Sequence, residues 1–218
     1  MKFKPTLLAL VISASSTAHA QIEPDAATLA YLRSKPFGDM TVVVGISLDK
    51  IVLGMERCEG SYGFDPVSFD ILQPLKFSPG VAQPVAGQWT FRFKLNRCSA
   101  SKIYNVQWQA NPTGTPKPAI LPPGMSRANL ALALDLKNVI ASEGLRSHAV
   151  PQQCRSVRIV DTSVSMEPTA LTIDGVRRDG VWEEQWTAQM CGVEFKSAIC
   201  LVPAAGGGTD WMSKPCPR

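Results

Sequence analysis

The stretch Val181–Cys200 holds the side chains whose types and spacing come closest to a chemical site. Its residues alternate as in a β-strand, and this alternation places Glu184 on the same face as Trp182 and Trp186. A carboxylate on a face that packs against a core is costly unless it is paired or hydrogen-bonded. The position of Glu184 therefore needs a physical explanation, and three are open.

The first explanation is structural: Glu184 forms an ion pair with an arginine, or a bulge turns its side chain outward. The second is a binding site, in which Glu184 and the flanking tryptophans contact a ligand, with Trp211 as a further aromatic candidate. The third is acid–base chemistry by a carboxyl group that apolar surroundings keep partly protonated. A lone carboxylate lacks catalytic partners, so no residue is assigned as catalytic. The arginines available for an ion pair on nearby segments are Arg155, Arg158, Arg177 and Arg178.

Other chemical motifs are sparse in the sequence. His148 is the only histidine after residue 20, and its neighbour Ser147 is not part of a Gly-x-Ser-x-Gly elbow. The sequence contains no Cys-x-x-Cys, His-Glu-x-x-His, EF-hand or Walker motif. The glycine-rich run 206–210 lacks the lysine of a phosphate loop, and we interpret it as a turn. We therefore predict no metal site and no cofactor.

Residues 1–20 have the pattern of an export signal. A lysine-rich start precedes the short apolar run Leu7–Ala14, and the Ala-His-Ala that ends at Ala20 predicts cleavage between Ala20 and Gln21. No later segment is long and apolar enough to span a membrane. We expect a soluble protein in the periplasm or the medium of a bacterium. The formal charge of +4 for the whole sequence gives no basic footprint for nucleic acid.

Six cysteines lie after the export signal, and an even number in an oxidising compartment indicates disulfides. An internal repeat suggests how they pair. A Gly-x-Trp motif ends at Trp89 and again at Trp182, and each motif has one cysteine upstream and another nine residues downstream. Equivalent bridges in the two copies, with the two remaining cysteines joined to each other, give the pairs Cys58–Cys98, Cys154–Cys191 and Cys200–Cys216.

Hydrophobic periodicity predicts an α+β protein with two related halves, each a helix packed on an antiparallel β-meander and stapled by disulfides. The first half, residues 21–111, is expected to contain a helix over 26–34 capped by Asp25, a strand over 41–46, a helix over 47–56, and strands over 66–72, 86–95 and 102–110. The stretch 41–54 is also compatible with two strands.

The proline-rich run 112–125 is predicted to be a connector between the halves. The second half, residues 126–218, is expected to begin with a helix over 126–143, capped by Ser126 and stopped by Gly144. Four strands are predicted to follow this helix, over residues 155–161, 168–173, 180–189 and 193–202.

A set of short motifs in the second half resembles a pattern in uncharacterised exported proteobacterial proteins. The motifs are Trp182-x-Glu184-x-Trp186-Thr187, Cys191-Gly192 and Gly207-Gly208-Thr209, with Leu121-Pro122-Pro123-Gly124 ahead of a helix. The resemblance covers mostly residues 120–210. It implies an exported protein and carries no established activity, so no functional residue is transferred from it.

These features favour a non-enzymatic exported protein that binds a protein or a glycan of the bacterial envelope, with Trp182, Glu184, Trp186 and Trp211 as the candidate binding residues. One alternative is a carboxylate-dependent envelope hydrolase with Glu184 as the acid or base. If its substrate were a glycoside, a second carboxyl group would have to face the same cleft. A further alternative is a purely structural envelope protein. The sequence makes no prediction about the oligomeric state.

Overall fold

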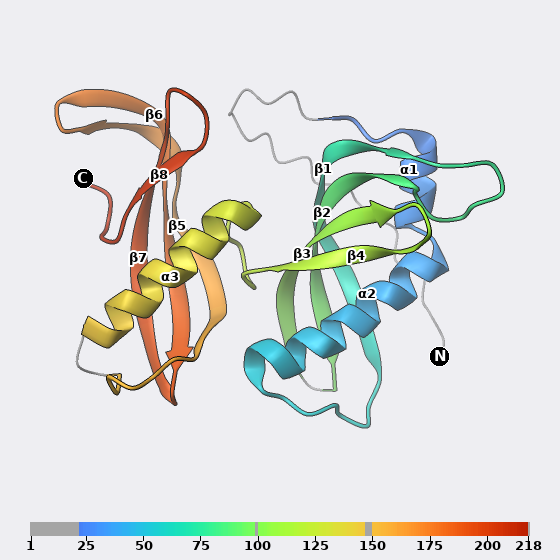
Figure 1. The fold of residues 1–218 in the computed structure, drawn as a ribbon, viewed down its shortest axis with the longest axis horizontal. Coiled ribbons are helices and arrows are strands. Elements are labelled where there is room, and N and C mark those ends of the chain that lie inside the picture. The colour runs from blue at the N-terminus through green and yellow to red at the C-terminus, as the bar shows by residue number, and fades with distance from the viewer. Residues whose placement is uncertain (1–21, 99, 147–149, 218) are drawn as a thin grey trace. The chain divides into compact units, whose positions relative to one another are not determined.

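The computed structural model of the protein describes residues 22–98, 100–146 and 150–217 (Figure 1). The chain divides after Leu121 into two compact units. In each unit, helix precedes a four-stranded antiparallel sheet whose strands follow one another in chain order. The protein is therefore α+β, as expected. The predicted export signal with its cleavage site Ala20–Gln21, and the candidate His148, lie outside the described residues.

The elements of the two units have the following bounds. In the first unit they are α1 (Ala26–Leu32), α2 (Lys35–Leu48), the single π-helical turn η1 (Asp49–Leu53), β1 (Tyr62–Lys76), β2 (Ala86–Arg97), β3 (Ala100–Asn111) and β4 (Gly114–Leu121). In the second unit they are α3 (Leu130–Arg146), β5 (Val157–Ile173), β6 (Val176–Met190), β7 (Val193–Pro203) and β8 (Thr209–Met212).

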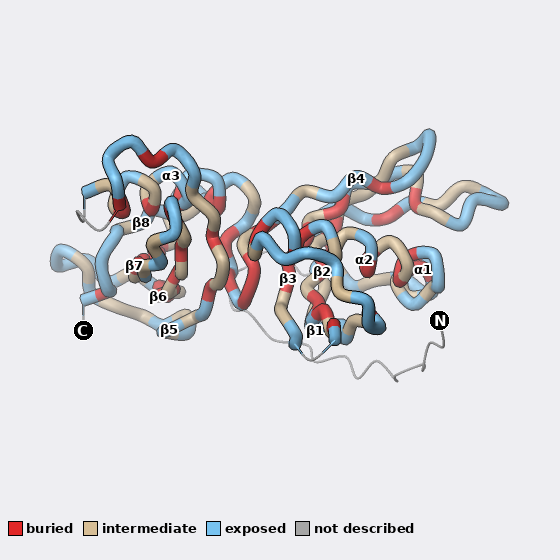
Figure 2. The backbone as a smooth tube through the Cα atoms, turned by 90° about the horizontal axis from the view of Figure 1, so that it is seen from below, coloured by how far each residue is buried: buried red, intermediate tan, exposed pale blue. Residues whose placement is uncertain are grey.

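The core of each unit lies between its long helix and one face of its sheet (Figure 2). In the first unit the inward residues of β2 are fully or nearly fully buried, as the alternation predicts: Trp89, Phe91, Phe93 and Leu95. In the second unit the equivalent residues of β6 are Trp182, Glu184, Trp186 and Ala188, and all four are buried. The Glu184 side chain therefore points into a core.

The predicted strand over 41–46 is wrong, because these residues belong to α2. Ser34 caps this helix by accepting from the Phe37 N–H, and Pro36 occupies its first turn, where no N–H is required. The hydroxyl of Thr41 donates to the carbonyl oxygen of Phe37 at 2.9 Å, and the Thr41 side chain is buried. Packing against the sheet thus overrides the strand preference of a run of β-branched residues.

The predicted connector 112–125 is also different in the structure. Residues 114–121 form β4, which pairs with β3, and the division between the units falls after Leu121. Pro116 and Pro118 fit this strand because β4 lies at the edge of its sheet, where a missing N–H costs no ladder bond.

Three differences concern the second unit. The strands predicted over 155–161 and 168–173 are one strand, β5, whose pairing with β6 is interrupted by four register shifts. The short edge strand β8 was not predicted. Gly144 does not stop α3: it is buried inside the helix, and a Cβ there would lie 2.6 Å from the Phe195 ring.

The three disulfides join the pairs expected from the repeat: Cys58–Cys98, Cys154–Cys191 and Cys200–Cys216. Cys98 and Cys191 each directly follow the second strand of their sheet, and each has a φ of 45°. The two bridges thus anchor equivalent hairpins. In the described part of the chain, no helix is long and apolar enough to cross a membrane.

Gly45 sets the distance between α2 and its sheet. A Cβ at Gly45 would lie 2.8 Å from Cδ1 of Leu95, which is fully buried and has little room to move. We therefore expect Gly45→Ala to lower the free energy of unfolding by about 1–3 kcal/mol through overpacking. The matched control is Gly38→Ala in the same helix, because its Cβ would meet Phe64 at an ordinary 3.6 Å. That change should be neutral or stabilising by up to about 1 kcal/mol. Urea denaturation measures both values, and equal losses would contradict this packing.

Candidate functional site

Glu184 lies in the core of the second unit with no exposed surface, and its carboxylate accepts four hydrogen bonds. The Oε1 atom accepts from the backbone N–H of Arg127 at 2.7 Å and from the indole Nε1 of Trp182 at 2.8 Å. The Oε2 atom accepts from the hydroxyl of Ser126 at 2.7 Å and from the indole Nε1 of Trp186 at 2.8 Å. Both oxygens thus use both of their acceptor positions.

The expected ion pair of Glu184 with an arginine is wrong, as is the expected outward bulge. All four donors are neutral groups, and Arg127 contributes its backbone N–H while its guanidinium pairs with Glu167 at the surface. The Glu184 carboxylate is stabilised by these four hydrogen-bond donors, which replace the hydration that it loses on burial. Three of the four arginines considered have other partners: Arg155 bonds backbone carbonyls, Arg158 bonds Gln189, and Arg177 pairs with Asp179.

The carboxylate fastens the segment that leads into α3 to the middle of the sheet. Gly124, with a φ of +95°, passes so close to β5 that a Cβ there would lie 2.1 Å from the Thr162 carbonyl oxygen. The N–H groups of Met125 and Ser126 then donate to the Thr162 carbonyl and hydroxyl oxygens at 2.8 and 3.0 Å. Ser126 is therefore not the helix cap that we expected. Asn129 has that role, and its side chain accepts from the Leu132 N–H at 3.0 Å.

Three of the four predicted binding residues, Trp182, Glu184 and Trp186, come together in space, but in the interior. Trp182 is 8% exposed and Trp186 is 0% exposed, and both indoles use their only donor on Glu184. These side chains therefore form no aromatic platform at the surface. Trp211 lies on β8, where it pairs with Leu201 of β7, and it is 39% exposed. It is therefore the one predicted binding residue that is available to a partner.

A second buried polar cluster, in the first unit, was missed by the sequence analysis. The Nε atom of Arg97 lies 2.9 Å from Oδ2 of Asp49, and the hydroxyl of Tyr104 donates to Oδ1 of the same carboxylate. The side chains of Asp49 and Arg97 are each 6% exposed. Extending the alternation of β2 from Leu95 by two residues would have placed Arg97 on the core face.

The surroundings of Arg97 differ on the two sides of its guanidinium group. The Nη2 atom faces the thioether sulfur of Met55 at 3.2 Å, and a thioether is a weak acceptor. The Nη1 atom is buried and has no hydrogen-bond partner among the residues that the structure describes.

Burial raises the pKa of the Tyr104 hydroxyl far above its usual range, and the hydrogen bond to Asp49 raises it further.

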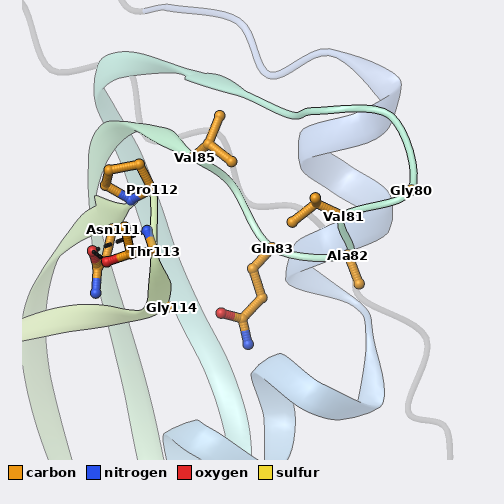
Figure 3. Close-up of a pocket in the computed structure, with 9 residues that line it drawn as sticks. All are labelled: Gly80, Val81, Ala82, Gln83, Val85, Asn111, Pro112, Thr113 and Gly114. Atoms are coloured by element: carbon orange, nitrogen blue, oxygen red, sulfur yellow. Dashed lines mark hydrogen bonds between the residues drawn. The ribbon is translucent and has the colours of Figure 1, made fainter.

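Other candidate sites are weaker. Within the described ranges, no group of three or more His, Cys, Asp or Glu side chains is placed to hold a metal ion. A hollow of about 470 Å³ lies between the β1–β2 loop and the β3–β4 turn (Figure 3). None of its lining residues is titratable, and its Asn111 side chain already accepts from Thr113 at 3.1 Å. The hollow therefore offers space without a charged group that would select a ligand.

Comparison of the chain with known proteins gives no match among protein-family models, curated proteins or solved structures.

The role of Glu184 can be tested by Glu184→Gln. Glutamine keeps one oxygen but turns an NH2 group toward two of the four donors, so we expect the free energy of unfolding to fall by about 2–5 kcal/mol. The matched control is Glu167→Gln, since this side chain is 72% exposed and should change stability by less than about 0.5 kcal/mol. Chemical denaturation measures both, and a Glu184→Gln protein as stable as the control would show that the carboxylate does not hold the core.

The buried tyrosines predict a loss of stability at alkaline pH. The pKa values of Tyr31 and Tyr104 are raised in the folded protein, so their stabilising contribution is complete below the unfolded value of about 10 and is lost as the pH rises through the folded values. We expect Tyr104→Phe to be less stable near neutral pH but to lose less stability above about pH 10. Urea denaturation across this range measures the slopes, and parallel slopes for the two proteins would contradict the burial of an ionisable Tyr104.

Proposed function

We propose that the protein is an exported, disulfide-stapled, non-enzymatic module that binds a protein partner through the outer face of α2 and η1. The observation that carries this proposal is a set of exposed aliphatic side chains on that face and directly after it, since Met55 follows Gly54, the residue that ends η1. Val43 is 63% exposed, Ile51 is 57% exposed and Met55 is 40% exposed. We call these three residues the α2 stripe.

The α2 stripe is notable because the opposite face of the helix already fills the core. Val42, Gly45, Leu48 and Val52 are buried against the sheet, so Val43 and Ile51 add apolar residues to an outer face that also exposes Ser47 and Lys50. A surface helix normally has polar residues on its outer face, and apolar residues that recur there at helical spacing are typical of an interaction surface. Aliphatic side chains suit apolar protein side chains, and the stripe has no aromatic ring on which a sugar could stack. These features favour a protein partner over a glycan.

The geometry of Glu184 does not support the alternative of a carboxylate-dependent hydrolase. A general acid or base must reach the substrate within hydrogen-bond distance. Glu184 has no exposed surface, and its four donors occupy both oxygens. We therefore assign it a structural role. Export, and membership of the group of exported proteins that the sequence resembles, remain part of the proposal. The three disulfides are compatible with an oxidising compartment.

We also propose that the two units arose by duplication. Strand registers support this, because Trp89 pairs with Trp108 on β3 and Trp182 pairs with Leu201 on β7, both at an offset of 93 residues. The same offset relates Tyr104 to Ser197. Each of these hydroxyls donates to a carboxylate near the C-terminal end of its helical segment, Asp49 in one unit and Glu143 in the other.

Site-specific photocrosslinking tests the binding surface. A benzophenone amino acid at position 43 or 51 should give one discrete adduct in the cells that export the protein, and Val43→Lys should abolish the adduct formed at 51. The control is the same probe at Leu134, which is 56% exposed on α3. Equal adducts at 134, or no adduct at 43 and 51, would contradict the proposal.

A further inference from the structure

The side of the Arg97 guanidinium that faces away from Asp49 carries buried donors that the described residues do not fully satisfy. The Nε atom lies within ion-pair distance of Asp49 Oδ2, at 2.9 Å, without hydrogen-bond geometry, while Nη1 and Nη2 form the fork of parallel donors at the end of the group. Within the described residues, Nη1 has no hydrogen-bond partner, and Nη2 donates to the sulfur of Met55. A fork of this kind is matched by the two oxygens of a carboxylate, which can accept both bonds at once.

The fold does not require a charged residue at the position of Arg97. Arg97 is the last residue of β2 and Met190 is the last residue of β6, and each is followed by the hairpin that carries a bridged cysteine. Met190 is 1% exposed and packs in an apolar cluster with Val150 and Cys154. The second unit thus closes the same corner with an apolar side chain, which is usually the more stable solution. The ion pair with Asp49 accounts for one side of the guanidinium group, and the donors on its other side need a separate explanation.

The loop that covers the fork is short and held at both ends. Gly54 ends η1 in the left-handed conformation, and the Met55 N–H donates to the Asp49 carbonyl oxygen at 3.1 Å. At the other end, Cys58 is bridged to Cys98, and its N–H donates to the Tyr62 hydroxyl at 2.9 Å. The side chain of Met55 contacts the fork through its sulfur and is 40% exposed. It is unbranched, flexible and weakly held, so it can move away from the fork while the loop stays anchored.

We propose that Arg97 is a carboxylate-binding residue and that Met55 is the gate above it. Displacement of the Met55 side chain opens Nη1 and Nη2 to one carboxylate, which binds both atoms side by side. Met55 is also the last residue of the α2 stripe, so the site lies under the end of the proposed interface. With the proposed function, this defines the partner as a protein segment that places apolar side chains along α2 and an acidic side chain or a C-terminal carboxylate at Arg97.

The test is a titration of the protein with sodium acetate, followed by NMR at the Nε–Hε resonance of Arg97, with sodium chloride at the same ionic strength as the control. We expect a saturable shift with acetate in the millimolar range and none with chloride. Met55→Ala should tighten acetate binding by about two- to fivefold, because a weak hydrogen bond no longer competes. Met55→Leu, which keeps the cover, should not tighten it.

Two further arms separate the possible outcomes. The short peptides acetyl-Ala-Ala with a free carboxylate and acetyl-Ala-Glu-Ala-amide distinguish a C-terminal from an acidic side-chain ligand, and acetyl-Ala-Ala-amide should not bind. Equal shifts with acetate and chloride, or an acetate affinity that Met55→Ala leaves unchanged, would overturn the proposal. Because this titration does not depend on Val43 or Ile51, where the crosslinking probes are placed, the crosslinking experiment can fail while this one succeeds, and the reverse.

Discussion

The cost of burying a carboxylate constrains both units more than any other single interaction. An ionised side chain in a small core is tolerated only when its oxygens meet donors that replace water. The second unit meets this requirement with four neutral donors on Glu184, two of them from the segment that leads into α3. The first unit uses an arginine and a tyrosine on Asp49 at the end of its helix. In both units the carboxylate links helical and sheet parts of the core, so the same physical demand positions the helix.

The two buried polar clusters differ in how completely their polar atoms are paired. This difference distinguishes a structural role for Glu184 from a candidate binding role for Arg97. Glu184 has a donor at every acceptor position and no exposed surface, so its carboxylate stabilises the fold and is not available to a ligand. Arg97 leaves part of its guanidinium group unmatched beneath a flexible methionine, although the second unit closes the same corner with Met190 alone. A guanidinium group that pairs with Asp49 and still has an unmatched donor, near an exposed apolar stripe, favours recognition by the first unit.

Part of this structure could be predicted from the sequence, because some patterns depend only on neighbouring residues. The alternation around Trp89 and Trp182 gives the two central strands and their inward faces. The repeated spacing of cysteines gives the bridged pairs. The run Thr41–Ile46 could not be assigned locally, because burial against the sheet decides in favour of helix. The prolines of β4 predict a connector when only neighbouring residues are considered. They are tolerated in a strand because β4 lies at the edge of the sheet, and that position is known only once the sheet is assembled.

The candidate sites were harder to predict because their partners are distant in sequence. Sequence spacing identified Glu184 as an unusual core residue, and it pointed to arginines. Its donors on Ser126 and Arg127 lie 58 and 57 residues away, and one of them is a backbone group that no residue type reveals. Asp49 and Tyr104 are 55 residues apart, and only the packing of η1 on the sheet brings them together.

Native-state hydrogen exchange of the indole N–H groups tests most directly the claim that Glu184 is an internal clamp. If the carboxylate holds Trp182 and Trp186 in a dry core, their indole protons should exchange only through global unfolding of the second unit, at rates that follow its stability in denaturant. The exposed Trp211 should exchange rapidly under the same conditions. Exchange of Trp182 and Trp186 as fast as that of Trp211 would mean that solvent reaches Glu184, and it would contradict the structural role assigned to this residue.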